Sequence, residues 1–220
     1  MIETTKETIE RIGLIPVLRA KSAGQAHAVV KAMIAGGVNI VEVTMTVPGA
    51  VDLIRELRHE YGDDLLLGSG TVTTPDEAEE TIAAGAEFVV SPSFHPTVVS
   101  RTRAMDKVAI AGALTPTEVI TAWRSNAHYV KVFPCSAMGG ASYLKSLLAP
   151  FPMLKLIPTG GVTLETAEEF IRAGARALGV GGDLVNIAAI DAGHPERITE
   201  AARAYLEVLT KVRTEMQAGL

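Results

Sequence analysis

The chain has 220 residues, of which 48% are hydrophobic and 20% are charged, so it can bury a sizeable core, and its length lies in the range in which an α/β barrel folds as one domain. The net charge of −5 comes without a basic patch, which argues against nucleic acid as a partner, and no apolar run is long enough to span a membrane. The polar, acidic N-terminus argues against a signal or transit peptide, and the single cysteine fits a cytoplasmic protein.

Apolar runs alternate with helical stretches along the chain, beginning with an expected strand at residues 14–19 and a helix at 22–35, with Ser22 as its N-cap. Thr74-Pro75 and Thr115-Pro116 each combine a capping residue with a proline in the first turn, which predicts two further helix starts. The later strands are expected at residues 38–44, 65–68, 88–91, 108–112, 129–133, 154–158 and 177–180. The later helices are expected at residues 48–60, from 74, 95 and 115 onward, at 141–148, 164–173 and finally 195–212.

Eight successive β-α units predict a closed parallel barrel, a single-domain (β/α)8 TIM barrel over residues 1–220 with an N-terminal helical extension and a long C-terminal helix. A faint repeat supports one unit used several times, because residues 35–37, 84–85 and 173–174 each place Ala-Gly between a helix and a strand. Such a glycine can cap the helix in the left-handed conformation. A doubly wound open sheet is less favoured, because no Gly-x-Gly-x-x-Gly follows the first strand.

Residues 129–134, Tyr-Val-Lys-Val-Phe-Pro, resemble a short buried strand in which Tyr129, Lys131 and Phe133 share one face. An ammonium group out of water must be paired or lose its proton, and the neutral amine is a nucleophile toward ketones and aldehydes. The alternative is that Lys131 lies near the end of the strand and extends its amine to water. This segment alone does not decide between the two hypotheses.

In a barrel of this type the active site lies at the C-terminal ends of the strands. One cation, one carboxylate, one lysine and several hydroxyls are expected to meet there, which predicts a site for a small molecule and not a flat protein-binding face. The expected strand-end residues are Arg19, Glu42, Thr44, Ser69, Gly70, Thr71, Ser91, Pro92, Gly112, Lys131, Thr159, Gly160, Gly161, Gly181, Gly182 and Asp183, with Phe133 on the Lys131 face.

Glu42 lies inside an apolar strand, where a buried carboxylate needs a partner. One hypothesis is a structural ion pair with Lys131 or Arg19, and the other is a general acid/base whose pKa is raised by burial. The two are compatible, because an amine beside a carboxylate is the arrangement that a proton shuttle needs. Glu42 and Lys131 could meet only across a small closed barrel, and perturbed acids cluster at functional sites, so the functional hypothesis is favoured.

The glycine turns at residues 159–161 and 181–182 follow the seventh and eighth strands, a position that favours an anion held by backbone N–H groups. An ordinary tight turn is the alternative. Asp183 would repel a phosphate unless it faces away, for example as the N-cap of a short helix at 184–188. The five histidines show no ligand spacing and Cys135 supplies no zinc set, so we expect no metal and no cofactor, and Cys135 is expected to be a packing residue.

Six short segments occur in order along the chain: residues 15–19 (Ile-Pro-Val-Leu-Arg), 41–44 (Val-Glu-Val-Thr), 68–72 (Gly-Ser-Gly-Thr-Val), 90–92 (Val-Ser-Pro), 130–134 (Val-Lys-Val-Phe-Pro) and 157–162 (Ile-Pro-Thr-Gly-Gly-Val). Together they resemble the KDPG/KHG aldolase family, whose members cleave 2-dehydro-3-deoxy-6-phosphogluconate (KDPG) and 4-hydroxy-2-oxoglutarate (KHG). The resemblance covers about residues 10 to 212.

The resemblance implies a metal-free class I aldolase, a homotrimer that binds a 2-keto acid, with Lys131 as the Schiff-base lysine and Glu42 as the general acid/base. It also implies that Thr71 helps to hold the pyruvate carboxylate and that residues 159–161 lie toward the phosphate. Many members have an arginine in place of Thr46, whereas others have the Thr-Val-Pro sequence found here together with an arginine matching Arg19. Many also have serine in place of Asp183, so the phosphate preference stays open.

Two other functions remain open from the sequence. A 2-dehydro-3-deoxy-6-phosphogalactonate aldolase would use the same chemistry with the opposite configuration at C4. A non-catalytic barrel that binds a phosphorylated ligand would keep Lys131 and Glu42 as a structural ion pair.

Overall fold

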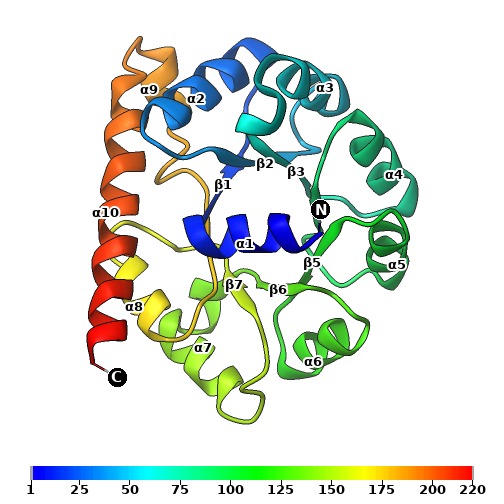
Figure 1. Cartoon of the computed structure of the whole chain (residues 1–220), viewed down its shortest axis with the longest axis vertical. Coiled ribbons are helices and arrows are strands. Elements are labelled where there is room, and N and C mark those ends of the chain that lie inside the picture. The colour runs from blue at the N-terminus through cyan, green and yellow to red at the C-terminus, as the bar shows by residue number, and fades with distance from the viewer. Residues whose placement is uncertain (1, 220) are drawn as a thin grey trace.

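The computed structural model describes residues 2–219, in which eight parallel strands form a barrel surrounded by helices (Figure 1). The strands are β1 (Leu14–Leu18), β2 (Ile40–Thr44), β3 (Leu66–Gly70), β4 (Phe88–Val90), β5 (Val108–Ala113), β6 (Tyr129–Val132), β7 (Leu156–Pro158) and β8 (Leu178–Val180). The helices are α1 (Ile2–Ile12), α2 (Ala23–Ala35), α3 (Ala50–Tyr61), α4 (Pro75–Ala84), α5 (Pro96–Ala104), α6 (Pro116–Arg124), α7 (Ala141–Leu148), α8 (Ala167–Arg172), α9 (Ile187–Asp191) and α10 (Glu196–Ala218). Two short 3₁₀ helices, η1 (Gly62–Asp64) and η2 (Cys135–Met138), complete the elements.

The sheet runs in the order β7-β6-β5-β4-β3-β2-β1-β8, so each strand pairs in parallel with its neighbour in the chain, and β1 pairs with β8. A parallel bridge between Thr159, just beyond β7, and Gly179 in β8 joins the two ends of this sheet. The predicted (β/α)8 barrel is therefore confirmed. Its interior brings β2 and β6, which are not neighbours in the sheet, to face each other.

The helix starts follow the predicted capping chemistry. The Ser22 side chain accepts a hydrogen bond from the backbone N–H of Gln25 at the start of α2. Thr74 and Thr115 each form a complete capping box with the glutamate three residues later, followed by a proline in the first turn. Gly85, after α4, has φ of 120°, which confirms the predicted left-handed ending there.

Several predicted boundaries were wrong. β3 ends at Gly70 instead of residue 68, so Ser69 and Gly70 belong to the strand, and α10 continues to Ala218 instead of residue 212. The helix expected from residue 164 begins only at Ala167. Its expected first turn is replaced by a loop, in which the Thr163 N–H donates to the Thr166 hydroxyl at 3.0 Å.

The N-terminal end of the barrel is covered by α1, which crosses the middle of the ring of strands (Figure 1). Glu10 of α1 accepts a hydrogen bond from the Tyr129 hydroxyl at 2.8 Å and one from the Lys155 amine at 2.8 Å. Tyr129 is fully buried at the start of β6, so these contacts fasten α1 to the strand that also contains Lys131.

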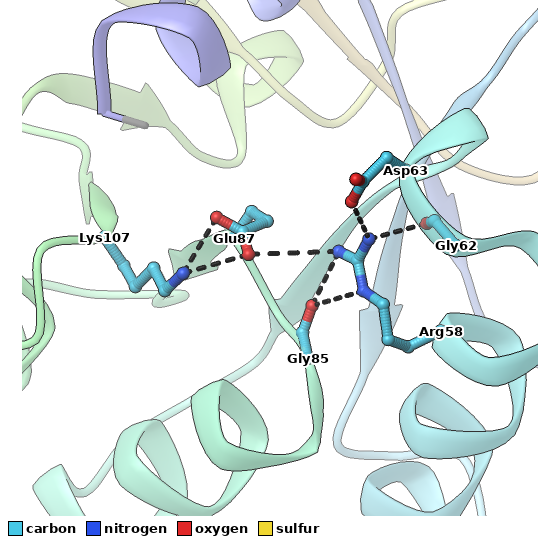
Figure 2. A network of polar contacts seen from close by, with 6 residues as sticks. All are labelled: Arg58, Gly62, Asp63, Gly85, Glu87 and Lys107. Carbon is cyan, nitrogen blue, oxygen red and sulfur yellow. Dashed lines mark hydrogen bonds and ion pairs between the residues drawn. The ribbon is translucent and has the colours of Figure 1, made fainter.

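A polar network centred on Arg58 joins α3 to β4 and β5 at this same end (Figure 2). The Arg58 guanidinium donates to the Gly85 carbonyl at 2.9 Å and to the Gly62 carbonyl at 2.6 Å. It also lies 4.0 Å from Glu87, whose carboxylate accepts from the Lys107 amine at 2.8 and 2.9 Å. These contacts hold the N-terminal end of the barrel together, and in barrels of this type the active site lies at the opposite end.

No helix within residues 2–219 is both long enough and apolar enough to cross a lipid bilayer.

Candidate active site

Lys131 and Glu42 meet inside the barrel. Lys131 extends from β6 and Glu42 from β2, and the Lys131 Nζ lies 3.5 Å from the Glu42 Oε1. Their side chains are only 5% and 3% exposed. The hypothesis that Lys131 extends to water is therefore wrong, and the predicted meeting across the barrel is confirmed.

Burial and nearby positive charges act in opposite directions on the pKa of the Glu42 carboxyl. Burial raises the pKa of the Glu42 carboxyl, and the positive charges of Lys131 and Arg19 oppose this rise. Its Oε1 has no well-formed hydrogen bond among the described residues, and its contact with the Lys131 amine, at 3.5 Å, is an ion pair. A buried oxygen without a donor is costly, so Oε1 is ready to accept a proton or a hydrogen bond from a bound molecule.

Gly70, at the end of β3, provides the space that the Glu42 side chain occupies. A Cβ placed on residue 70 would lie 2.0 Å from the Glu42 Oε1 and 2.4 Å from its Cγ. The sequence predicts Gly70 only as a strand-end residue, although a glycine inside a strand often marks a close approach by another group. The absence of a side chain at residue 70 thus allows Glu42 to point toward Lys131.

Thr71 follows directly and has a strained backbone. Its φ is 60°, a conformation that β-branched residues rarely adopt. Strain of this kind persists where the surrounding structure imposes it, and it is concentrated at functional sites. The residue that the resemblance relates to carboxylate binding is therefore also a backbone outlier at the C-terminal end of β3.

An open cavity of about 410 Å³ lies at the C-terminal end of the barrel. Its lining includes eight of the residues expected at the site, namely Arg19, Phe133, Thr159, Gly160, Gly161, Gly181, Gly182 and Asp183. Phe133 connects this cavity to the buried pair, because the Lys131 Nζ lies 5.5 Å from the centroid of the Phe133 ring.

Arg19 lies just beyond β1 and has an exposed side chain in this cavity. It forms no ion pair within residues 2–219, so the hypothesis that it pairs directly with Glu42 is wrong. Its guanidinium can therefore hold a carboxylate brought by a ligand.

Thr44 and Pro92 are placed differently from this group. The Thr44 hydroxyl is fully buried, donates to the Leu18 carbonyl at 2.9 Å and lies 2.7 Å from the Thr46 hydroxyl. Pro92 packs against β5, where a Cβ on Gly112 would lie 2.3 Å from the Pro92 carbonyl carbon. Neither residue, nor Thr71, lines the 410 Å³ cavity.

The two glycine turns that border the cavity differ in character. Gly160 and Gly161 have φ of 86° and 75°, and a Cβ on Gly161 would lie 2.3 Å from the Ser136 side chain, so this turn requires glycine. A Cβ on Gly181 or Gly182 would meet no atom within 4 Å. The second turn therefore faces open space into which a ligand can extend.

Asp183 is not the N-cap that the sequence suggested. The short helix there is α9, which begins at Ile187, and its cap is Asn186, whose side chain accepts from the Ala189 N–H at 3.0 Å. The Asp183 Oδ2 instead accepts from the Leu164 N–H at 3.1 Å and from the Tyr205 hydroxyl of α10. The tyrosine lies 22 residues further along the chain, so local sequence gave no sign of this contact.

Cys135 is buried, as expected of a packing residue, and burial raises the pKa of its thiol to about 11. It is therefore a poor nucleophile at neutral pH. Residues 2–219 contain no group of three or more His, Cys, Asp or Glu side chains arranged to hold a metal ion.

Comparisons with known proteins agree with this geometry. The family model for KDPG and KHG aldolase matches residues 5–201. The 2-dehydro-3-deoxy-phosphogluconate aldolase of Treponema pallidum is 34% identical over 94% of this chain and 98% of its own length. The KHG/KDPG aldolase of Escherichia coli is 32% identical over 93% of this chain and 96% of its own.

Among solved structures, a KDPG aldolase from Legionella pneumophila, crystallised with pyruvate captured as a covalent carbinolamine, matches with a TM-score of 0.84 and 29% identity. The match covers 91% of this chain and 97% of that one. With a barrel of the same shape and a family model matched over most of its length, this chain belongs to the KDPG and KHG aldolase family.

Proposed function

We propose that this protein is a class I pyruvate aldolase that cleaves 2-dehydro-3-deoxy-6-phosphogluconate to pyruvate and glyceraldehyde 3-phosphate, 4-hydroxy-2-oxoglutarate to pyruvate and glyoxylate, or both. The observation that supports it most directly is the 3.5 Å approach of the Lys131 amine to the Glu42 carboxylate in a buried part of the barrel. Burial raises the pKa of Glu42, which favours the uptake of a proton by this carboxyl.

In the proposed reaction, the neutral Lys131 amine attacks the C2 ketone of the substrate to form a carbinolamine. Loss of water gives a protonated Schiff base, which is an electron sink. Glu42, through a water molecule, removes the proton of the C4 hydroxyl, the C3–C4 bond breaks, and its electron pair moves into the Schiff base to give an enamine. The aldehyde leaves, a proton returns to C3, and water hydrolyses the Schiff base to pyruvate and free Lys131.

Arg19 and Thr71 have the proposed role of holding the keto-acid carboxylate, so that the C2 carbon stays within reach of Lys131. Phe133 and Thr159 would border the carbon chain of the substrate. The turns at residues 160–161 and 181–182 would lie along its far end, which agrees with the open space beside the second turn.

Borohydride trapping tests the proposal. The protein is incubated with pyruvate, reduced and digested, and the peptide containing Lys131 is measured by mass spectrometry. A pyruvate-derived adduct on Lys131, absent from the Lys131→Met variant, is the expected result. An unmodified chain would favour the alternative in which Lys131 and Glu42 form only a structural ion pair in a ligand-binding barrel.

The configuration at C4 is tested separately. Cleavage of the phosphogluconate substrate and of its phosphogalactonate epimer can be compared by the rate of pyruvate release. Faster cleavage of the phosphogalactonate epimer would show that it, and not the phosphogluconate, is the preferred substrate. The proposed chemistry at Lys131 would be unchanged.

A homotrimer remains a prediction from the resemblance, and a cytoplasmic location remains a prediction from the single cysteine and the polar N-terminus. Light scattering of the purified chain tests the assembly, since a trimer has three times the chain mass of 23.2 kDa.

A further inference from the structure

The cavity at the C-terminal end of the barrel contains a carboxylate as well as a cation. Arg19 and Asp183 are the two charged residues among those that line it, and both have exposed side chains. Deeper in the barrel, Lys131 forms an ion pair with Glu42, so the carboxylate of Glu42 balances the charge of the amine. The cavity therefore offers no surplus of positive charge to a ligand.

The Asp183 carboxylate is fixed at this position by two donors from separate parts of the chain. The Leu164 N–H comes from the loop between β7 and α8, and the Tyr205 hydroxyl comes from α10. Tyr205 is fully buried, so its hydroxyl is held in place by the packing of α10. These two donors fix the position of the carboxylate relative to the cavity.

This arrangement affects how the cavity can bind an anion. In barrels of this type, the loops after the seventh and eighth strands bind phosphate through their backbone N–H groups. Here the N–H of Leu164, in the loop after β7, already donates to Asp183. The same carboxylate adds a negative charge beside Gly182, where the turn is open. A phosphate in this space would meet a like charge.

We propose that Asp183 determines the substrate preference of this site. It disfavours 2-keto-4-hydroxy acids whose far end is a phosphate. Acids with the same carbons C1 to C4 but an uncharged or shorter chain beyond C4 are disfavoured less. The inference rests on the proposed function, because it concerns the part of the substrate that extends outward from Lys131. 4-Hydroxy-2-oxoglutarate ends one carbon beyond C4, close to the reacting bond, so Asp183 would affect it least. The phosphate at C6 of the longer substrate would reach the open turn.

A matched pair of substrates isolates the effect of the phosphate. 2-Dehydro-3-deoxygluconate and its 6-phosphate differ only in that group, and pyruvate release gives kcat/KM for each. Asp183→Asn keeps the shape of the side chain and an acceptor oxygen but removes the charge. We expect this variant to raise the ratio of kcat/KM for the phosphorylated over the unphosphorylated substrate by about tenfold, mostly through KM, since one like charge is removed.

Asp183→Ser provides the same comparison if the asparagine variant does not fold. Competitive inhibition by inorganic phosphate should become stronger in either variant, whereas 4-hydroxy-2-oxoglutarate cleavage and borohydride trapping with pyruvate should change little. An unchanged substrate ratio and unchanged phosphate inhibition, with the adduct on Lys131 still formed, would overturn the role of Asp183 alone. Absence of that adduct from the wild-type chain would instead overturn the proposed function.

Discussion

Gly70→Ala places a methyl group where the Glu42 side chain lies. The new Cβ would be 2.0 Å from the Oε1, 2.4 Å from the Cγ and 2.5 Å from the Cδ of Glu42, all closer than non-bonded atoms approach. Because the strand backbone at residue 70 is held by pairing with β2, the glutamate side chain is the part that can move. To restore ordinary contact it must shift by about 1 Å or more, which would take Oε1 out of reach of Lys131 at its present 3.5 Å.

A displacement of about 1 Å at a catalytic group can lower the rate by roughly 10²-fold. We therefore expect kcat for cleavage to fall by about that factor, while pyruvate still forms a reducible adduct on Lys131. Gly24→Ala is a matched control, because Gly24 lies in α2 and a Cβ there meets no atom within 4 Å. That variant should keep the wild-type kcat.

Combining Gly70→Ala with Glu42→Asp separates a clash with the carboxylate from general damage to the barrel. The aspartate is shorter by one methylene, so its carboxylate lies further from residue 70. In the Glu42→Asp protein, Gly70→Ala should therefore lower kcat much less than it does in the wild type. If Gly70→Ala stays within about threefold of the wild-type kcat, or if the two losses simply multiply, the idea that Gly70 positions Glu42 is refuted.

Glu42→Gln should lower kcat by about 10²–10⁴-fold. Because burial raises the pKa of Glu42, wild-type kcat should fall as the pH drops through a value above the ordinary glutamate range. The glutamine variant should lack this decrease of kcat at low pH. A decrease that persists in the variant would show that another group causes it. Lys131→Met should still fold, with a lower melting temperature because Glu42 loses its buried partner, and should abolish cleavage; measurable turnover would contradict the Schiff-base role. Arg19→Lys should raise KM and weaken pyruvate inhibition by about tenfold, because lysine cannot form two parallel hydrogen bonds to a carboxylate, whereas unchanged pyruvate binding would count against this role. Arg58→Met leaves the Gly85 and Gly62 carbonyls without their donor, so unfolding should become easier by about 1–3 kcal/mol with kcat/KM unchanged; equal stability in urea would show that water replaces the guanidinium.

The barrel could be predicted from the sequence because its evidence is local. Each unit has its own apolar run, three helices start at a capping side chain (Ser22, Thr74 or Thr115), and α4 ends at a glycine, Gly85. The approach of Lys131 to Glu42 could also be predicted from the sequence. Alternation along each strand indicates which side chains point inward, and a closed barrel brings opposite strands together.

The remaining features of the site depend on contacts between distant segments. The space beside Glu42 is created by Gly70, 28 residues away, and Asp183 is held by a tyrosine of α10 that belongs to the outer layer. The strained φ of Thr71 is imposed by its surroundings and not by its own side chain, which disfavours that conformation. Periodicity in the sequence does not predict these three features, because each of them arises only when distant segments pack together in the folded barrel.

The position of the cavity has a kinetic consequence. It lies at the C-terminal end of the strands, and Phe133, whose ring centroid lies 5.5 Å from the Lys131 Nζ, connects it to the buried pair. We expect substrates and products to pass through this cavity. In the proposed reaction the aldehyde lies on the outer side of the pyruvate that is bonded to Lys131, so it must leave before pyruvate can pass. For synthesis the order is reversed: pyruvate must enter first, and an aldehyde that arrives early can only obstruct it. High aldehyde concentrations should therefore inhibit the condensation competitively with pyruvate.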